Sequence, residues 1–272
     1  CMISVMLPRA AVSAERVDEV LKSETKIHDP KEPKTLPKNG KGEVAFEHVS
    51  FHYPGAEEDV LHDITFTAKP GETTAFIGST GCGKSTLVNL IPRFYDVTEG
   101  KITIDGQDVR DLTQHELRDK LGYVPQKGVL FSGNIASNIM FGNPAGSEQE
   151  MTEAAQIAQA VEFIDTKPER YKSPISQGGA NVSGGQKQRL SIARAIAKHP
   201  DVYIFDDSFS ALDYKTDTVL RSALKEKTTD SVVLIVAQRI STILHAEQII
   251  VLDDGKIVGK GTHEELLKTC DA

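Results

Sequence analysis

The sequence predicts an α/β fold with a parallel sheet as its core and helices on both faces of that sheet. Two observations predict this fold class. From residue 183 onward, apolar segments of strand length alternate with segments of helical periodicity, as in a covered parallel sheet. Between residues 43 and 106, short segments alternate between apolar and polar residues with turn residues between them, which predicts a neighbouring antiparallel sheet.

The overall composition is that of an ordinary globular protein. Of the 272 residues, 39% are hydrophobic and 26% are charged, and the chain is long enough to bury a full core. The formal charge of −8 argues against nucleic acid as the main partner, because phosphate backbones select basic surfaces. Cys1, Cys82 and Cys270 are widely spaced and form no metal-binding or disulfide pattern, which favours a reducing compartment.

Residues 1–42 are expected to form an arm and a linker ahead of the main domain. The start, CMISVMLP, lacks the basic residues and the longer apolar stretch of a signal peptide, and no run of about 18 apolar residues occurs that could span a bilayer. AAVSAERVDEVLK has the pattern of an amphipathic helix, and residues 29–42, rich in Pro, Lys and Gly, predict an extended linker. The helix is either the frayed start of a soluble protein or the stub of a longer helix, and these residues alone favour neither.

The expected elements of the main domain, residues 43–272, follow in order. VAFEHVSFHY, ITFTAK and KITIDG predict antiparallel strands, and the more continuously apolar ETTAFIG leads into a glycine-rich loop and a helix that begins near Gly83. Residues 133–172 contain AAQIAQAVEFI at helical spacing and predict a small helical subdomain, which we place at about residues 127–190. After Ser183 we expect helix QKQRLSIARAIAK, strand 201–206, helix 214–227, strand SVVLIVA, short helix ISTILHA, strands QIIVLDD and KIVGKG, and helix THEELLKT.

GSTGCGKST, residues 78–86, matches the phosphate-binding pattern G-x-x-x-x-G-K-[ST]. Its glycines let the backbone N–H groups point at phosphate oxygens, and the start of the following helix adds a favourable dipole. Lys84 can reach the outer phosphates and Ser85 can ligate Mg²⁺, whereas a purely structural turn would need neither. We therefore predict a P-loop NTPase (RecA-like) core whose nucleotide-binding loop comprises Gly78, Ser79, Thr80, Gly81, Cys82, Gly83, Lys84, Ser85 and Thr86.

VYIFDD, residues 202–207, delivers two acids to the end of a buried strand. In P-loop enzymes an aspartate at this place holds the same Mg²⁺ as the phosphate loop, and we assign that role to Asp206. A structural role for an acid at a strand end is the alternative, and the upstream phosphate loop makes it the weaker one. Asp207 raises a further question, which is whether the second acid works as a base.

NVSGGQKQRL, residues 181–190, places Ser-Gly-Gly at a second helix start, which is another anion-binding end. One phosphate site does not need two such helices. At this point the sequence resembles the nucleotide-binding domain of an ABC transporter of the exporter type, over about residues 43–269. The pieces occur in that family's order: Tyr53, the P-loop, Gln126 in YVPQ, the SGGQ signature, the acidic strand, the SALD turn and a switch segment at residues 237–242.

The resemblance implies a role for each matching residue. Tyr53 would stack on the adenine of ATP, and Gln126 would lie between the Mg²⁺–water cluster and the membrane partner. Asp213 would lie at the interface between two subunits. The alternatives are Tyr53 as a strand-edge residue, Gln126 as a polar turn residue and Asp213 as a helix N-cap. The signature residues would bind the γ-phosphate of an ATP molecule held by the opposing subunit: Ser183, Gly184, Gly185 and Gln186.

Two residues depart from the family's hydrolytic pattern. Asp207 stands where the family has Glu, which polarises the attacking water. Its side chain is shorter by one C–C bond of about 1.5 Å, and a misplacement near 1 Å can cost on the order of a hundredfold in rate. Gln238 stands where the family usually has His, and an amide cannot shuttle a proton at neutral pH. The departures predict a site that binds ATP and hydrolyses it poorly, beside a signature that differs only at Val182.

The resemblance also implies the surroundings of the domain. In exporters of this type the nucleotide-binding domain follows the last transmembrane helix through an amphipathic arm, which favours the same role for residues 1–42. We therefore expect a transmembrane domain in the same full-length chain, a non-identical ABC half-transporter as partner, and a position on the cytoplasmic face of the cell membrane. The alternatives are a regulatory nucleotide-binding module without useful catalysis, a homodimeric exporter domain, and a soluble ABC protein that acts on nucleic acid.

Overall fold

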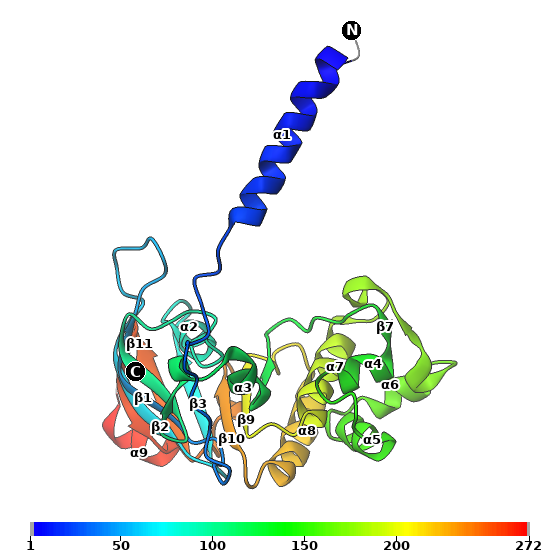
Figure 1. Ribbon diagram of the computed structural model, residues 1–272. Helices are drawn as coiled ribbons and strands as arrows, with labels where there is room; N and C mark the ends of the chain where they lie inside the picture. The colour runs from blue at the N-terminus through cyan, green and yellow to red at the C-terminus, as the bar shows by residue number, and fades with distance from the viewer. Residues whose placement is uncertain (1–2, 271–272) are drawn as a thin grey trace.

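A six-stranded sheet forms the centre of the computed structural model, which describes residues 3–270 (Figure 1). Its strands are β3 (Thr73–Gly78), β6 (Leu121–Val124), β9 (Val202–Asp206), β10 (Val232–Val236), β11 (Gln248–Asp253) and β12 (Lys256–Gly261). Their order in the sheet is β12-β11-β3-β10-β9-β6. All neighbouring pairs are parallel except β11 and β12, which form an antiparallel hairpin at one edge. The predicted parallel core is confirmed.

The parallel strands are continuously apolar because both faces of the sheet are covered. In β9, Val202 and Ile204 belong to the core shared with the antiparallel sheet, whereas Tyr203 and Phe205 belong to the core on the helical side. All four side chains are at most 2% exposed. This burial on two faces fixes the position of Asp206, the last residue of the strand.

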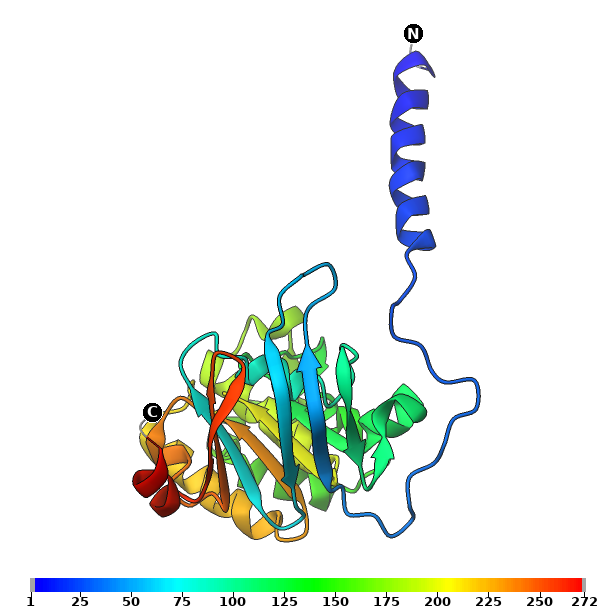
Figure 2. The same cartoon turned by 90° about the vertical axis from the view of Figure 1, so that its left-hand side faces the viewer.

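A four-stranded antiparallel sheet packs on one face of the central sheet, and its long strands stand out in Figure 2. It contains β1 (Val44–Phe51), β2 (Leu61–Ala68), β4 (Glu99–Ile104) and β5 (Gln107–Asp108), in the order β2-β1-β4-β5. Phe66 joins the two sheets, since its ring stacks on Phe46 at 4.6 Å and packs edge-on against Phe76 of β3 at 5.3 Å. The antiparallel sheet predicted from the alternating segments is confirmed.

A group of short helices lies to one side of the central sheet (Figure 1). It contains α4 (Ile135–Ile139), α5 (Glu148–Ile157), α6 (Val161–Asp165), the 3₁₀ turns η2 (Met140–Gly142) and η3 (Arg170–Lys172), and the strand pair β7 (Gly133–Asn134) and β8 (Pro174–Ile175). Its helices pack against α7 (Gly184–Ala197). A capping box begins α5: the Ser147 hydroxyl accepts from the Glu150 N–H, and the Glu150 carboxylate accepts from the Ser147 N–H.

Apart from the N-terminal helix, the other helical elements are α2 (Lys84–Asn89), α3 (Gln114–Asp119), α8 (Tyr214–Lys227), α9 (His263–Thr269) and the 3₁₀ turns η1 (Val109–Asp111), η4 (Gln177–Gly179) and η5 (Ile240–Thr242). The short helix predicted for ISTILHA is present as the 3₁₀ helix η5, which covers only the first three residues of that segment. The N–H groups of Thr242, Ile243 and Ala246 bond to the carbonyl three residues earlier. The β-branched residues crowded here disfavour an α-helix.

Helix α1 (Ile3–Lys22) projects away from the rest of the molecule (Figures 1 and 2). Its large apolar side chains, among them Leu7, Val17 and Leu21, are exposed. Within residues 3–270, no helix combines the length and the apolar character that a membrane crossing demands.

The linker that follows α1 is extended, as predicted, but it is also fastened to the domain, which its composition did not predict. Five hydrogen bonds hold residues 28–36. From donor to acceptor they are Gln114 N to Asp29 Oδ1 (2.9 Å), Gln114 Nε2 to Asp29 Oδ1 (3.2 Å), Leu36 N to Glu116 Oε1 (2.9 Å), Arg93 Nη1 to His28 O (3.0 Å) and Lys34 N to Asp111 O (2.8 Å). The bond from the Gln114 backbone is the main cause that lowers the pKa of Asp29. Residues 28–36 of the linker are therefore attached to the domain, and we call this segment the strap.

Replacing Asp29 and Glu116 together with Ala should free this strap. Three of the anchoring bonds would be lost, so trypsin should cut after the exposed Lys31 and Lys34 about threefold faster or more, because cleavage follows local opening. Mass spectrometry of the fragments measures the rate. Glu32→Ala, an exposed acid in the same segment, is the control. An unchanged rate in the double variant would show that these bonds do not hold the linker.

Candidate nucleotide-binding site

Residues 78–86 turn sharply between the end of β3 and the start of α2. Gly78, Gly81 and Gly83 have φ angles of 151°, 80° and 104°, in a region that residues with side chains rarely adopt. A Cβ atom at Gly83 would also lie 2.8 Å from Cδ2 of Leu61. The path of the chain therefore requires glycine at these positions of the motif.

Lys84 begins α2, and its side chain folds back into the loop. Its ammonium group donates hydrogen bonds to the carbonyl oxygens of Gly78 (2.6 Å) and Ser79 (3.0 Å), and the residue is 9% exposed. A buried ammonium needs acceptors or anions around it, and here the carbonyls of the loop supply them. Lys84 is thus held at the place where phosphate oxygens would enter the loop.

Ser85 and Asp206 meet at the carboxyl end of β9. The Ser85 hydroxyl donates to Oδ1 of Asp206 at 2.9 Å, and Asp206 is buried. Burial raises the pKa of Asp206, while hydrogen bonds from Ser85 and Tyr123 and the charge of Lys84 oppose that shift. Mg²⁺ prefers oxygen ligands and is held in such sites by few protein groups. A hydroxyl that faces a carboxylate across the end of a phosphate loop fits that ion.

Tyr123 on β6 belongs to this site and was not singled out from the sequence. Its hydroxyl lies 2.8 Å from Oδ1 of Asn89 and 3.4 Å from Oδ2 of Asp206. Burial, and then the charge of Asp206, raises the pKa of Tyr123, so the phenol stays protonated and can donate. The YVPQ string contains Tyr123, but only the pairing of β6 with β9 brings its hydroxyl to the acid.

Asp207 is buried directly after β9 and adopts a left-handed backbone with φ of 51°. The Gln126 amide donates to Oδ2 of Asp207 at 3.0 Å. Burial is the main cause that raises the pKa of Asp207, and the charge of Asp206 adds to it. The structure therefore brings Gln126 to the second acid, where the amide covers one of the two carboxylate oxygens.

Gln238 is exposed two residues after the end of β10. It lines a small crevice together with Asp207, Ser210 and Arg239. The two residues that depart from the expected hydrolytic pattern, Asp207 and Gln238, therefore border one crevice.

Tyr53 follows β1 and lies beside the phosphate loop. Its hydroxyl is 2.7 Å from Oγ1 of Thr86, the last residue of the motif. The ring makes edge-to-face contacts with Phe51 and Tyr95, with centroids 5.0 Å and 5.2 Å apart. Two aromatic neighbours thus hold Tyr53 beside the end of the motif.

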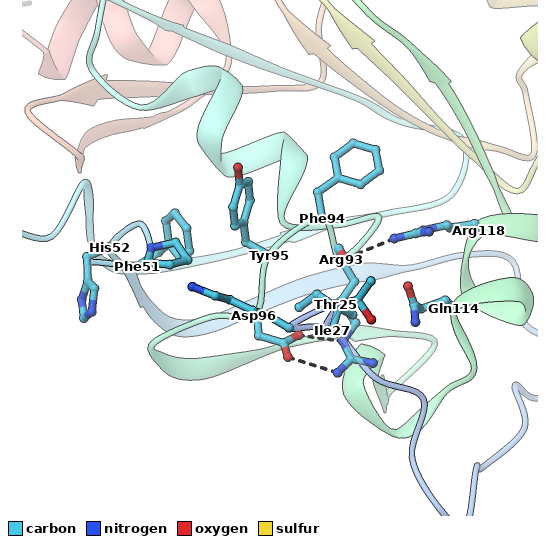
Figure 3. Close-up of a pocket in the computed structure, with 12 residues that line it drawn as sticks. Thr25, Ile27, Phe51, His52, Arg93, Phe94, Tyr95, Asp96, Gln114 and Arg118 are labelled. Atoms are coloured by element: carbon cyan, nitrogen blue, oxygen red, sulfur yellow. Dashed lines mark hydrogen bonds and ion pairs between the residues drawn. The ribbon is translucent and has the colours of Figure 1, made fainter. Parts of the chain in front are cut away.

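A hollow of about 710 Å³ lies between the linker and the segment after α2 (Figure 3). Phe51, His52, Phe94 and Tyr95 form part of its wall, and Thr25 and Ile27 of the linker another part. None of residues 78–86 lines this hollow. It is therefore separate from the phosphate site, although Phe51 and Tyr95 also contact Tyr53.

The SGGQ signature begins α7, which lies apart from α2 and the phosphate loop in Figure 1. Ser183 and Gln186 form a capping box. A Cβ atom at Gly184 would meet no atom within 4 Å, and one at Gly185 would come only to 3.6 Å from the Ala211 carbonyl. Neither glycine has a positive φ. Within residues 3–270, neither close contacts nor the backbone conformation therefore require glycine at these two positions.

Asp213 caps α8. Its carboxylate accepts from the Thr216 N–H at 2.9 Å and from the Thr216 hydroxyl at 2.6 Å, and these bonds lower the pKa of Asp213. The N-cap alternative is thus part of what this residue does. Asp213 is also exposed, so its carboxylate remains accessible to a second molecule while it caps α8.

A glycine-rich loop, a buried lysine and a strand-end aspartate on a mostly parallel sheet define a P-loop nucleotide-binding domain. Residues 61–210 match the family model described as ABC transporter. The chain belongs to the ABC transporter family, and its fold is that of the family's ATP-binding domain.

Relatives agree with this assignment. The chain is 47% identical, over 99% of its length, to an uncharacterized ABC transporter ATP-binding protein of Mycobacterium bovis, and 44% identical, over 97%, to another of Bacillus subtilis. A solved bacterial Atm1-family ABC exporter with ATP bound is 34% identical and covers 98% of this chain, with a TM-score of 0.89. The chain spans about half of each relative, namely 46%, 45% and 46%.

Asp206→Asn should raise the melting temperature of the nucleotide-free protein at pH 7. Folding raises the pKa of Asp206, so the charged carboxylate destabilises the folded state at any pH above that raised pKa. This cost in folding free energy disappears as the pH falls toward the ordinary pKa of 3.8, because the acid becomes protonated in both states. The gain in Tm, about 2–4 °C per kcal/mol for a chain of this size, should therefore shrink between pH 7 and pH 4. Differential scanning calorimetry measures it.

The same variant should lose the extra stabilisation that Mg²⁺ adds to ATP, because one of the two oxygen ligands would be an amide. The comparison is the Tm with ATP and Mg²⁺ against ATP and a chelator. Asp254→Asn, in an exposed turn with φ of 47°, is the matched control and should behave like the parent. If Asp206→Asn retains the full effect of Mg²⁺, Asp206 is not a ligand.

Proposed function

We propose that this chain binds ATP with Mg²⁺ and forms one ATP-binding half of an ABC exporter. The observation that carries the proposal is the separation of two anion-binding helix starts, at α2 and at α7, on one chain (Figure 1). In the part of the chain that the structure describes, neither packing nor backbone conformation requires the glycines of the second start. A second subunit that presents its own ATP to Ser183, Gly184 and Gly185 gives those glycines a purpose, because a close phosphate leaves no room for side chains.

Each residue of the first site would then have a task. The N–H groups of residues 78–86 and the Lys84 ammonium would hold the phosphates, and Tyr53 would stack on the adenine. Ser85 and Asp206 would hold Mg²⁺, which when bound neutralises charge on the outer phosphates. Tyr123 would orient Asp206 through its hydroxyl.

Binding of ATP would close two such domains head to tail. Each ATP would lie between one P-loop and the opposing signature loop, with Ser183 and Gln186 at the γ-phosphate. Asp213, exposed at the start of α8, would lie at the interface between the subunits. Hydrolysis and release of phosphate would reopen the pair.

The chain's own site is proposed to hydrolyse ATP weakly. Asp207 is shorter than the expected Glu, and Gln126 covers one of its oxygens. Gln238 lines the same crevice, where an amide can donate or accept a hydrogen bond but cannot transfer a proton at neutral pH. A general base must reach the water that it activates, and both departures act on that step.

The partners follow from the same proposal. A provisionally named multidrug export ATP-binding/permease protein of Staphylococcus aureus is 46% identical over 83% of this chain, which spans 39% of it. The projecting α1 and the attached linker would continue into a transmembrane domain of the full-length protein. The domain would then lie on the cytoplasmic face of the cell membrane, beside a non-identical half-transporter that supplies the competent catalytic residues.

Two alternatives keep specific support. Asp207 and Gln238 also suit a regulatory nucleotide-binding module, and kinetics with the natural partner separate it from a working exporter half. A homodimeric exporter would show two identical copies when the native assembly is isolated. The net charge of −8 disfavours a role on nucleic acid.

Asp207→Glu combined with Gln238→His should raise the ATP turnover of the purified protein about tenfold or more. The longer acid would regain the reach that a misplacement near 1 Å removes, and imidazole would restore proton transfer. Release of inorganic phosphate measures turnover. Asp254→Glu with Gln248→His, two changes of the same kind outside the site, is the control. Fast turnover by the parent that the double variant leaves unchanged would remove the weak-site proposal.

Gly184→Ala should distinguish the function of the signature loop from ATP binding at the chain's own site. A Cβ atom fits at this position without a clash, and Ala favours the first turn of a helix, so the Tm should stay equal or rise. ATP binding to the isolated chain should be unchanged. Turnover by the assembled transporter should fall about tenfold or more, because the methyl group would approach the phosphate of the partner. Unchanged turnover in the assembly would contradict the proposed use of the signature.

A further inference from the structure

The carboxylate of Asp217 is buried between three segments that flank the proposed ATP site. Asp217 lies on α8, one turn after the N-cap, and is 0% exposed. On one side, Arg221 donates from Nε to Oδ1 of Asp217 at 2.7 Å and from Nη1 to the Ser241 carbonyl at 3.2 Å. One guanidinium therefore joins the buried acid to the switch segment, residues 237–242.

A second guanidinium reaches the same carboxylate from the switch segment. Arg239 directly follows Gln238, and its Nη1 lies 3.8 Å from Oδ2 of Asp217. Arg239 also donates to the carbonyls of Leu212 (3.3 Å) and Ser210 (3.1 Å). These carbonyls belong to the loop of residues 207–213, which begins with the second acid and ends with Asp213. Arg239 therefore contacts α8, the switch segment and this loop together.

Oδ2 of Asp217 has no hydrogen-bond partner among residues 3–270, although it is fully buried. A buried acceptor without a donor is unfavourable and uncommon in native proteins. The Arg239 guanidinium lies roughly 0.9 Å beyond the usual N–H···O distance of about 2.9 Å. A small shift of the switch segment would complete this bond, whereas removal of Asp217 would leave Arg221, with a side chain only 19% exposed, without its counter-charge.

We propose that Asp217 is a positioning residue for ATP hydrolysis: through Arg239 it holds Gln238 and the loop of residues 207–213 in a fixed relation to each other. The role rests on the proposed function, since it matters only if both segments flank ATP. The side-chain hydrogen bond and ion pairs of Asp217 run to Arg221 and Arg239, and none runs to the phosphate loop or to Asp206. Removal of Asp217 should therefore change the rate of hydrolysis and leave the binding of ATP almost unchanged.

A purely structural role makes different predictions. An acid in the first turn of a helix is favourable by itself, because it meets the positive end of the helix dipole. If Asp217 only stabilised α8, its loss would lower the Tm and loosen α8, and at temperatures well below the Tm turnover would be unchanged. The two roles thus differ in which backbone amides become exposed and in whether kcat falls.

The experiment uses the full-length transporter with its partner and three variants: Asp217→Asn, Arg239→Gln and the double variant. Glu226→Gln, an exposed acid on the same helix, is the control. Steady-state kinetics give kcat and KM for ATP. Hydrogen exchange followed by mass spectrometry reports on residues 207–213, on residues 238–242 and, for comparison, on the phosphate loop.

Asp217→Asn should lower the kcat of the transporter about tenfold or more, because the loop of residues 207–213 ends with Asp213 at the proposed interface with the partner's site. KM for ATP should stay within about twofold, and amide exchange should rise in both flanking segments but not in the phosphate loop. The double variant should be no slower than the slower single variant, because both changes break one connection. Exchange that rises only in α8, or fold-losses that multiply in the double variant, would overturn the proposal. If the parent hydrolyses no ATP, the proposed function fails, and the exchange pattern alone still decides whether Asp217 joins the two segments.

Discussion

The site depends on one geometric constraint, which is that β3, β10 and β9 are parallel neighbours and end at the same edge of the sheet. Val236 of β10 pairs with Phe76 on one side and with Asp206 on the other. The phosphate loop, the switch segment and the acidic loop therefore leave the sheet at one level, where parallel sheets bind their ligands. The contact between Ser85 and Asp206 follows from this register, although 121 residues separate the two side chains.

In the structure the polar groups of the site satisfy one another. Ser85 bonds to Asp206, Gln126 to Asp207, and Lys84 to carbonyls of its own loop. Each bond offsets part of the penalty for burying charge or a polar group. Bonds to phosphate and metal would replace these bonds in the proposed ATP site, whose donors are already in place.

Local patterns predicted most of the fold and the phosphate site. The P-loop, the acidic strand and α7 with its cap carry their signals within about ten residues each, and all lie in the expected elements. The sequence did not show Tyr123, whose role comes from the strand order, or Asp217, which looks like any acid in the first turn of a helix. It also did not show the linker contacts, because Asp29 meets Gln114 across 85 residues. The short helix predicted for ISTILHA forms only over Ile240–Thr242, as a 3₁₀ helix, since periodicity alone takes no account of β-branched crowding.

The attachment of the linker has a mechanical consequence. A chain bonded at several points between residues 28 and 36 has little slack there to absorb rotation of the domain. Only residues 23–27 separate α1 from His28, the first anchored residue, so the base of α1 is tied closely to the domain, and a 20-residue helix is about 30 Å long. If the base of α1 tilts by a few degrees, the opposite end of the helix moves sideways by about the helix length multiplied by the angle, which is on the order of an ångström or more. The hydrogen bonds of the linker would thus convert a small rotation of the domain into a larger displacement of the N-terminal end of α1.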